Sequence, residues 1–435
     1  MNTQTLSQRY NVNDVNELGF AVHQGNYEKT LSLIKKGIDI NCIPSLIERF
    51  DIEKSSWLIE KNKYNKTILM LALNCRLDSL KYREKIVTTL VKHGANVMAS
   101  DTAENDTPLH YAALRSMYWR KSHLPFRLPC NKAFSFNFHY SYWESIDNCI
   151  EILLKAGSDP NIKNKYGNTP LHCGCLLGMS ASNIKKLIEH GANIHAKNNF
   201  GATPLHMCFS GENGPCYSMH HSVNDGLYIV SPENCHFNHE LCCYWKALCT
   251  TLIAYGANIN AQDNDGYTPL YHWLCSNSQF CRNSSDRYSK TSIRFFLKNK
   301  ADINIHNNKK ESPLHYACWS CHTDAIKMLI EAGANVNSLT SDYKTPLDLA
   351  LEDSVPWEHN KVYDRRWGKA PKEKKKVEKI LRKAGGKRGS ELAQKNFDSS
   401  DFQSIHQPKS LNSDLYLNII IIISIVALIF KSCSS

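Results

Sequence analysis

The sequence predicts an all-α fold: a solenoid of about eight stacked helix pairs, followed by a single C-terminal transmembrane helix. Three observations lead to this prediction. A Thr/Ser-Pro-Leu motif recurs along most of the chain, a glycine closes the segment behind each motif, and an uncharged apolar run lies near the C-terminus. Two short amphipathic helices cannot bury both apolar faces against one another, so each pair needs copies on either side.

The repeating unit is clearest in residues 309–340. Ser312 is placed to cap a helix, and Pro313 suits the first turn because its missing N–H has no intrahelical partner there. Apolar residues then recur at spacings of three and four, first after Pro313 and again before Gly333, which predicts two short helices. Gly333 stands where a left-handed helix stop needs a residue without Cβ.

Copies of this unit follow one another along the chain. The helix starts, of which only the first lacks proline, are Thr67, Thr107, Thr169, Thr203, Thr268, Ser312 and Thr345. The helix-closing positions, of which one lacks glycine, are Gly37, Gly94, Gly157, Gly191, Gly256, Lys300, Gly333 and Gly385. An earlier unit at residues 16–41 lacks the Thr-Pro start, and its polar Asn16 suits a terminal cap that faces water.

This pattern resembles the ankyrin repeat, which has a Thr-Pro-Leu-His start and a period of about 33 residues, and the resemblance covers residues 16–389. The resemblance implies a curved solenoid of helix pairs with projecting β-hairpin fingers that binds other macromolecules. It also implies a structural role for the histidines of the helix starts, because in that family they hydrogen-bond between adjacent units. Here they are His110, His172, His206 and His315.

Extra residues enter mainly between the two helices of a unit. From Gly94 onward, 12 or 13 residues separate each helix-closing position from the next start, whereas 21 to 53 separate a start from its closing position. By repeat symmetry, these loops leave along one edge of the solenoid. The first insertion is expected to form a helix through Leu46 and Trp57. We therefore expect a repeat domain over residues 1–389, with insertions at 44–64, 117–147, 210–244, 276–290 and 353–371.

The insertion at residues 117–147 is rich in aromatic residues. So many rings are not expected to remain in water. They are interpreted either as a small cluster packed on their own repeat or as a surface that supplies hot spots to a protein partner. The candidates for such a surface are Trp119, Phe134, Phe136, Phe138 and Trp143.

The insertion at residues 210–244 gathers the side chains that a metal site would use: Cys216, His220, His221, Cys235, His236, His239, Cys242 and Cys243. Their spacing matches no standard zinc signature. Free thiols without a bound metal are therefore expected, and a zinc site is the alternative.

Finger tips and first helices are the usual binding elements of the resembling family. The candidate tips, which we expect to be exposed and replaceable by alanine without loss of stability, are Lys165, Asn199, Asn264 and Asn308. The sequence contains no P-loop, no Gly-x-Ser-x-Gly elbow and no His-Glu-x-x-His helix, so neither catalysis nor a cofactor is expected. Cys318 and Cys321 are interpreted as structural, because this Cys-x-x-Cys pair lies in a first helix without a preceding strand.

One short segment supplies almost all of the net charge. Residues 361–389 carry thirteen Lys and Arg against three Asp and Glu, which is +10 of the formal +11. The rest of the chain lacks the basic stripe that phosphate binding requires, so no nucleic-acid partner is expected. The segment is interpreted either as the solvated face of a terminal cap or as a surface attracted to anionic lipid.

The C-terminal residues indicate a membrane anchor. Residues 390–414 are polar and are interpreted as a linker, whereas residues 415–430, LYLNIIIIISIVALIF, carry no charge. As a helix, this run would span about 24 Å, enough for a thin bilayer. The competing interpretation is a buried core strand. With only the tail 431–435 behind it, the run predicts a tail-anchored, single-pass protein whose repeats lie on the cytosolic side. Seventeen cysteines and a polar N-terminus agree with a reducing compartment.

Together these features predict a membrane-tethered scaffold or adaptor that binds a protein partner through an ankyrin groove. The alternative is a substrate-recognition or regulatory subunit of an enzyme complex such as a ubiquitin ligase, although no F-box or SOCS-like box is recognisable. Ankyrin proteins with such tails resemble effectors of intracellular bacteria as well as eukaryotic adaptors, and the sequence does not choose between them. Partner choice lies in exposed residues, because a fold does not fix a function.

Overall fold

The structure is a computed structural model. It describes residues 11–51, 56–74, 80–115, 141–177, 179–209, 238–277, 287–352 and 371–392. The predicted membrane span at 415–430, its tail at 431–435 and the linker from residue 393 onward lie outside these residues. Within the described part of the chain, the helices are too short or too polar to cross a membrane.

The described residues form sixteen helices and one two-stranded sheet. The helices are α1 (Val12–His23), α2 (Tyr27–Lys35), α3 (Ile68–Leu73), α4 (Leu80–Lys92), α5 (Pro108–Arg115), α6 (Ser141–Lys155), α7 (Pro170–Leu177), α8 (Ala181–Glu189), α9 (Pro204–Met207), α10 (Asn238–Ala254), α11 (Pro269–Asn277), α12 (Arg287–Lys298), α13 (Pro313–Trp319), α14 (Thr323–Glu331), α15 (Pro346–Leu351) and α16 (Pro371–Lys383). The strands are β1 (Leu46–Asp51) and β2 (Ser56–Lys61).

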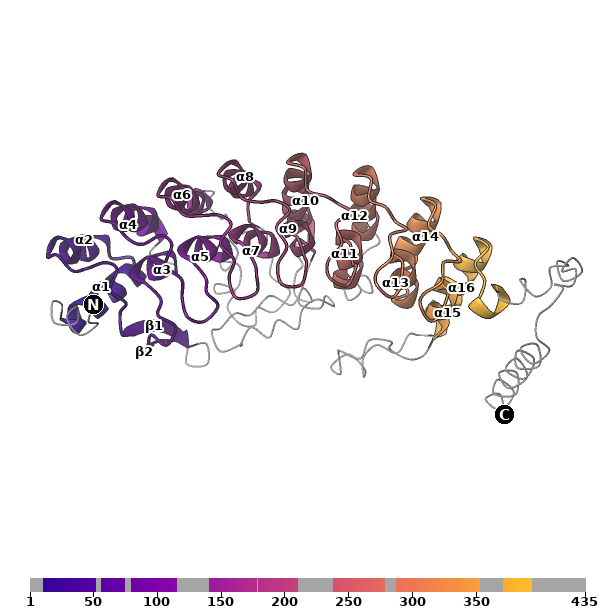
Figure 1. Ribbon diagram of the computed structural model, residues 1–435, viewed down its shortest axis with the longest axis horizontal. Coiled ribbons are helices and arrows are strands. Elements are labelled where there is room, and N and C mark those ends of the chain that lie inside the picture. The colour runs from indigo at the N-terminus through magenta and orange to yellow at the C-terminus, as the bar shows by residue number, and fades with distance from the viewer. Residues whose placement is uncertain are drawn as a thin grey trace, which may run out of the picture.

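The helices lie in two rows that run the length of an elongated molecule (Figure 1). The odd-numbered helices α1 to α15 pack on one another in sequence, and the even-numbered helices form the second row, with contacts such as α4 on α6 and α12 on α14. Helix pairs such as α1 with α2 and α13 with α14 join the two rows. This is the stacked solenoid that the sequence predicts.

The recurring leucine of each helix start forms the core of the first row. These side chains are at most 1% exposed: Leu69, Leu109, Leu171, Leu205, Leu270, Leu314 and Leu347. Burying one leucine side chain stabilises the fold by about 1.5–3 kcal/mol. Because each leucine is covered by the neighbouring units, the motif stabilises the stack rather than a single pair.

The helix stops have the backbone conformation that their glycines predict. Gly333 has φ +93° and Gly256 has φ +95°, and a Cβ atom at either position would meet nothing within 4 Å. The requirement for glycine is therefore conformational rather than steric. Lys300, the variant without glycine, takes the same left-handed region with φ 62°.

The first insertion differs from its prediction. Instead of a helix through Leu46 and Trp57, it forms the antiparallel hairpin of β1 and β2, with Leu46 opposite Lys61 and Phe50 opposite Trp57. The hairpin is seated on α1, where Oδ1 of Asn16 accepts hydrogen bonds from the backbone N–H groups of Ser45 and Leu46 at 2.8 and 3.1 Å. Asn16 is therefore buried at 7% exposure and does not face water as predicted.

Three predicted insertions also end earlier than expected. Helices α6, α10 and α12 begin at Ser141, Asn238 and Arg287, so they contain the last residues of the insertions predicted at 117–147, 210–244 and 276–290. At the C-terminus, residues 389–392 add one further helical turn where the predicted linker begins.

Candidate protein-binding surface

One polar side chain closes each turn between an even-numbered helix and the next odd-numbered helix. In the turn after α6, Oδ1 of Asn164 accepts hydrogen bonds from the backbone N–H groups of Tyr166 and Asn168, both at 3.0 Å. The same pair of bonds recurs in later turns, from Asn198, Asp263 and Asn307. Short polar side chains favour such turns because they can bond their own backbone two residues on.

These turns project as fingers, and several of them extend below the odd-numbered helices in Figure 1. The fingers have their tips in residues 62–67, 101–107, 164–169, 198–203, 263–268, 307–312 and 340–345. We call this series the finger row. In the first finger, Asn62 accepts from the backbone N–H of Lys66 as the other turn residues do, so β1 and β2 are an enlargement of that finger.

Backbone hydrogen bonds connect each finger to the one before it. The N–H of Lys165 donates to the carbonyl of Glu104 at 2.7 Å, and the N–H of Asn199 donates to the carbonyl of Tyr166 at 3.0 Å. Equivalent bonds of 2.9 Å run from Asn264 to Phe200, from Asn308 to Asp265 and from Ser341 to Lys309. The finger row is therefore one continuous hydrogen-bonded edge.

The four predicted tip residues are exposed, as expected. Three of them nevertheless have a structural role that the sequence reasoning missed. The side-chain amide of Asn199 donates to the carbonyl of Lys165 at 3.0 Å, and that of Asn264 donates to the carbonyl of Asn199 at 3.0 Å. The amide of Asn308 donates to the carbonyl of Asn264 at 2.9 Å. These asparagines reinforce the finger row, and whether they also contact a partner stays a prediction.

Glycines inside the turns allow this close approach. Gly201 has φ +74°, and a Cβ atom there would lie 2.2 Å from Oδ1 of Asn264 in the next finger. At Gly167, a Cβ atom would lie 2.4 Å from Oδ1 of Asn199. Unlike the helix stops, these positions require glycine for both conformation and space.

A second series of asparagines connects the fingers at their base. Asn161 donates through Nδ2 to the carbonyl of Gly191 at 2.8 Å, and its Oδ1 accepts from the N–H of Asn193 at 2.7 Å. The same two-bond clamp onto the next helix stop is made by Asn41, Asn260, Asn304 and Asn337. At the corresponding positions after α4 and α8, the sequence has Met98 and His195.

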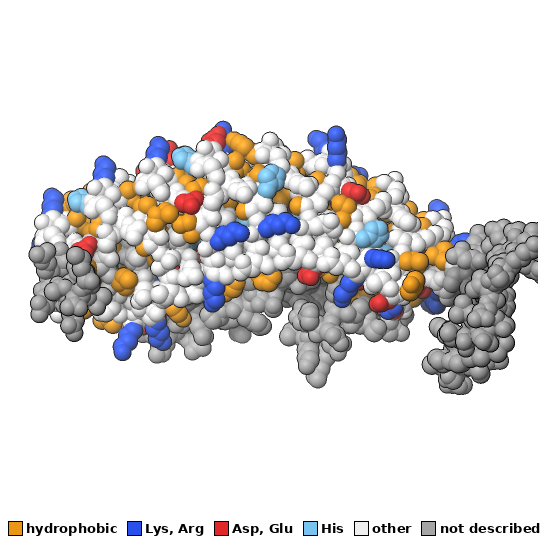
Figure 2. All heavy atoms as spheres, viewed as in Figure 1, with side chains coloured by type: hydrophobic (Ala, Val, Ile, Leu, Met, Phe, Trp, Pro, Cys, Tyr) orange, Lys and Arg blue, Asp and Glu red, His pale blue; other side chains and the backbone are white. Residues whose placement is uncertain are grey.

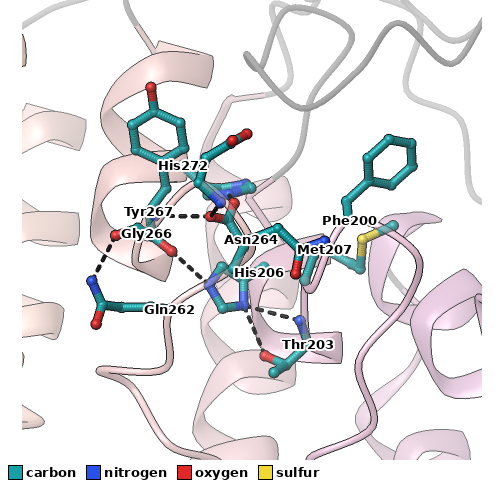
Figure 3. Close-up of polar contacts among 12 residues, drawn as sticks. Phe200, Thr203, His206, Met207, Gln262, Asn264, Gly266, Tyr267 and His272 are labelled. Carbon is teal, nitrogen blue, oxygen red and sulfur yellow. Dashed lines mark hydrogen bonds and ion pairs between the residues drawn. The ribbon is translucent and has the colours of Figure 1, made fainter. Parts of the chain in front are cut away.

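The histidine of each helix start joins adjacent units beneath the fingers. Figure 3 shows His206 between Thr203 and Tyr267. Its Nδ1 accepts from the backbone N–H of Thr203 at 3.0 Å and lies 2.9 Å from the Thr203 hydroxyl, while Nε2 donates to the carbonyl of Tyr267 at 3.1 Å. An imidazole that both accepts and donates in this way is neutral.

All four motif histidines have this arrangement, which confirms their expected structural role. Burial lowers the pKa of His110, His172 and His315 to about 4 and that of His206 to about 3. The pair α11/α12 differs, because Tyr271 occupies the motif position. There His272 lies 2.8 Å from Oδ2 of Asp263, the carboxylate that closes the finger turn.

Comparison with known proteins agrees with this architecture. The family model for ankyrin repeats (three copies) matches residues 138–218 and 281–356. The chain is an ankyrin-repeat protein. Ankyrin repeats typically mediate interactions between proteins.

Two curated relatives and one solved structure illustrate the similarity. Human Rabankyrin-5 is 24% identical over 256 residues, which are 59% of this chain and 19% of the relative. The B-cell lymphoma 3 protein homolog of Mus musculus is 31% identical over 94 residues, which are 22% of this chain and 19% of the relative. The chain thus matches about a fifth of the length of each. The solved ankyrin repeat domain of Bcl-3 is similar with a TM-score of 0.45 at 18% identity, covering 74% of this chain and 100% of that domain.

One buried carboxyl group of the ankyrin domain has a shifted pKa. Burial raises the pKa of Asp106 to about 7, although the side-chain amide of Asn164 in the next finger donates to it at 2.9 Å and opposes the shift. Asp106 precedes the helix start Thr107, so its protonation state is linked to the packing of two adjacent repeats.

The structure does not place the remaining predicted residues in a binding surface or a metal site. Trp119, Phe134, Phe136 and Phe138 lie outside the described residues, as do Cys216, His220, His221, Cys235 and His236. Trp143 belongs to α6, and His239, Cys242 and Cys243 belong to the first turns of α10. Among the residues that the structure describes, no group of three or more His, Cys, Asp or Glu side chains could hold a metal ion.

The residues of the Cys-x-x-Cys pair lie where the ankyrin fold predicts. Cys318 is fully buried in α13, and Cys321 has φ 57° in the turn that follows this helix. In the first unit, the turn between α1 and α2 holds Gly25 with φ 68°. The pair therefore has the positions of a small core residue and a turn residue, in agreement with its structural interpretation.

Sequence reasoning missed the most exposed aromatic side chain of the finger row. Tyr343 is 78% exposed and has φ 59°, in the turn position that Gly201 and Gly266 occupy in other fingers. Aligning the finger turns would have revealed it, because tyrosine stands there in place of glycine. On the side of the ankyrin domain that Figure 2 shows, charged side chains of both signs are scattered among small hydrophobic patches.

Proposed function

We propose that this ankyrin-repeat protein is a membrane-tethered adaptor that holds a protein partner on its finger row and catalyses no reaction. The observation that carries the proposal is the continuous set of hydrogen bonds from finger to finger, from Lys165 to Ser341. A surface that is already ordered loses little conformational entropy on binding.

The exposed tips supply the contacts in this proposal. Lys165, Asp265 and Lys309 are exposed at three of the tips, so a partner that lies along the row meets charges of both signs. Tyr343 is the proposed anchor at the C-terminal end. Tyrosine is among the residues most often found at binding hot spots, and a bulky residue held at positive φ is a local strain of the kind that marks functional sites.

The tether in this proposal is the uncharged run at residues 415–430, bounded by Asp414 and Lys431. Post-translational insertion of this run would leave the ankyrin domain on the cytosolic side. Such an arrangement would concentrate the partner at a membrane without any direct contact between the partner and the lipid.

Proximity labelling in cells tests the partner-binding part of the proposal. We expect the full chain to label a defined set of proteins, and the variant Tyr343→Gly to lose the strongest of them. The same variant should be at least as stable as the wild type, because glycine relieves the strained φ. This combination separates lost binding from lost folding.

The matched control is Asn105→Gly, which relieves the same backbone conformation, with φ 58°, in a finger near the other end of the row. It should retain the labelled set. If Tyr343→Gly and Asn105→Gly label the same proteins as the wild type, Tyr343 is not the anchor. If a variant with alanine at Lys165, Asp265 and Lys309 also labels the same proteins, the finger row is not the interface.

A further inference from the structure

The last helix of the ankyrin domain carries a concentrated positive charge. Residues 371–392 contain nine Lys and Arg against three Asp and Glu. In α16, the exposed basic residues are Lys372, Lys375, Lys376, Lys379, Arg382 and Lys383. We call these six residues the α16 basic face.

The basic face lies opposite the side by which α16 is anchored. Val377 and Leu381 are fully buried, and α16 packs on α14 and α15. In a helix, residues two positions from a buried residue, such as Lys375 and Lys379 around Val377, point away from it. The lysines are therefore presented to the surroundings by a helix whose position is fixed by packing.

Solubility of a terminal repeat does not explain this charge. The opposite end of the same solenoid, residues 12–36, is also a terminal helix pair, and it carries three acidic residues, Asp14, Glu17 and Glu28, against three lysines, Lys29, Lys35 and Lys36. A neutral balance is therefore sufficient to cap this solenoid at its N-terminal end. The excess of positive charge at α16 therefore has a different explanation.

Neighbouring acidic groups compensate only part of the charge. Arg382 forms a two-bond ion pair with Glu391 at 2.5 and 2.6 Å. Two further acidic residues, Glu373 and Glu378, lie on α16 itself. The nine basic residues still exceed these three, so the segment keeps a net charge of +6.

We propose that the α16 basic face binds the anionic headgroups of a lipid bilayer and fixes the C-terminal end of the ankyrin domain against the membrane. Clusters of four to eight Lys and Arg on a helix or beside a membrane span are typical of binding to phosphatidylserine or phosphoinositides. The charge is confined to one end of the solenoid, whereas nucleic-acid binding would require a stripe along the contact face.

This lipid contact would act together with the proposed membrane tether, and its role in the cell rests on that tether. Twenty-two residues separate Leu392 from Leu415, and such a chain reaches at most about 75 Å. If residues 415–430 enter a bilayer, α16 is the helix of the ankyrin domain nearest to them along the chain. Contact of its basic face with the headgroups would set the direction in which the finger row points from the membrane.

Vesicle co-sedimentation tests the lipid contact separately from the anchor. The full chain is used with Ile421→Asp and Ile425→Asp, which disable the proposed span without adding positive charge. We expect this protein to bind vesicles of phosphatidylcholine mixed with phosphatidylserine and not vesicles of phosphatidylcholine alone. Binding should weaken as salt rises, because the Debye length falls from about 10 Å at 0.1 M to about 3 Å at 1 M.

Two charge-reversal variants on this background decide whether α16 is responsible. Lys375→Glu, Lys376→Glu and Lys379→Glu should lower the partition onto anionic vesicles at least about tenfold. The matched control, Lys35→Glu, Lys36→Glu and Lys85→Glu, changes three exposed lysines, two at the C-terminal end of α2 and one in α4, and alters the net charge by the same amount. It should bind nearly as well as the parent, with circular dichroism confirming that both variants are folded.

Three results would overturn the proposal: equal binding to both kinds of vesicle, equal loss in the two charge-reversal variants, or binding to a DNA duplex by a protein that ignores anionic vesicles. The last result would assign the basic face to nucleic acid. Because the span is disabled in every sample, none of these results bears on the anchor. Failure of the anchor would instead appear in membrane fractionation of the unmodified chain.

Discussion

The side-chain amide of Asn264 donates a 3.0 Å hydrogen bond to the backbone carbonyl of Asn199 in the preceding finger. This bond makes the tip asparagines structural as well as exposed. Replacing Asn199, Asn264 and Asn308 together with alanine should therefore destabilise the domain by about 0.5–1 kcal/mol for each bond lost. Urea denaturation measures the change. Lys165→Ala is the control, because its side chain is 57% exposed and its 3.7 Å ion pair with Glu104 lies at the surface, where such a pair contributes little, so the midpoint should move little. An unchanged midpoint in the triple variant would show that the side-chain bonds contribute nothing.

Glycines of the finger turns should be less tolerant of substitution than glycines of the helix stops. Gly256→Ala should cost about 1–2 kcal/mol, since a left-handed conformation is its only penalty. Gly201→Ala should cost more, because the added Cβ would also lie 2.2 Å from Oδ1 of Asn264. Thermal or urea unfolding of the two variants side by side gives the comparison, and equal losses would mean that the next finger moves aside freely.

Acidification below neutral pH should destabilise the ankyrin domain. The four motif histidines have pKa values of about 3 to 4 in the folded chain, against 6.5 when unperturbed. The unfolded chain therefore binds protons first, so stability is lost as pH falls from 6.5 to about 4. Urea midpoints across this range measure the effect. A midpoint that is constant or rises on acidification would contradict it.

Asp106 should contribute the opposite pH dependence. Its pKa is raised from 3.8 to about 7, so the folded chain keeps this proton while the unfolded chain loses it, and stability falls as pH rises from about 4 to 7. Asp106→Asn keeps an oxygen for the Asn164 amide and removes the charge. We expect this variant to be more stable than the wild type at pH 7 and nearly equal to it at pH 4. A gain that does not change with pH would have another origin.

The membrane anchor makes a separate prediction. Truncation after Asp414 should release the protein into the soluble fraction of carbonate-washed membranes. Ile421→Arg with Ile425→Arg should do the same, since each arginine at the centre of a span costs about 2.5–3.5 kcal/mol on insertion. Protease added outside intact organelles should digest the ankyrin domain and protect only the C-terminal residues. Recovery of the unmodified chain in the soluble fraction, as complete as that of the truncation, would remove the tether from the proposed function.

Much of the helical architecture was predictable because its signals are local. The Pro of a helix start and the glycine of a helix stop act through φ within a few residues, so Pro313 correctly marks the start of α13 and Gly333 the end of α14. The hairpin of β1 and β2 was not predictable from periodicity, because its residues interrupt the repeat and have no second copy for comparison. Its place becomes visible only when Asn62 is recognised as the turn residue of a finger.

The finger row was only partly predictable. Turn residues such as Asn199 indicate exposure, and the structure confirms it. Their hydrogen bonds to the preceding finger depend on how two units stack, which neither turn encodes alone. The exposed Tyr343 was overlooked for a related reason, since it is unusual only by comparison with Gly201 and Gly266 in other turns. Both features become visible only when two repeats are compared with each other, and not when one repeat is inspected alone.

The asparagine clamps at the base of the fingers also have a mechanical consequence. In a solenoid, tension passes from each repeat to the next only through nearest-neighbour contacts. After α4, Met98 replaces the clamping asparagine but keeps one of the two bonds, because its Sδ atom accepts from the backbone N–H of Asp159 at 3.3 Å. After α8, His195 stands at this position and makes neither bond among the described residues. When a partner pulls on a chain that is held at one end, the joint after α8 is therefore the one at which the repeats would separate first.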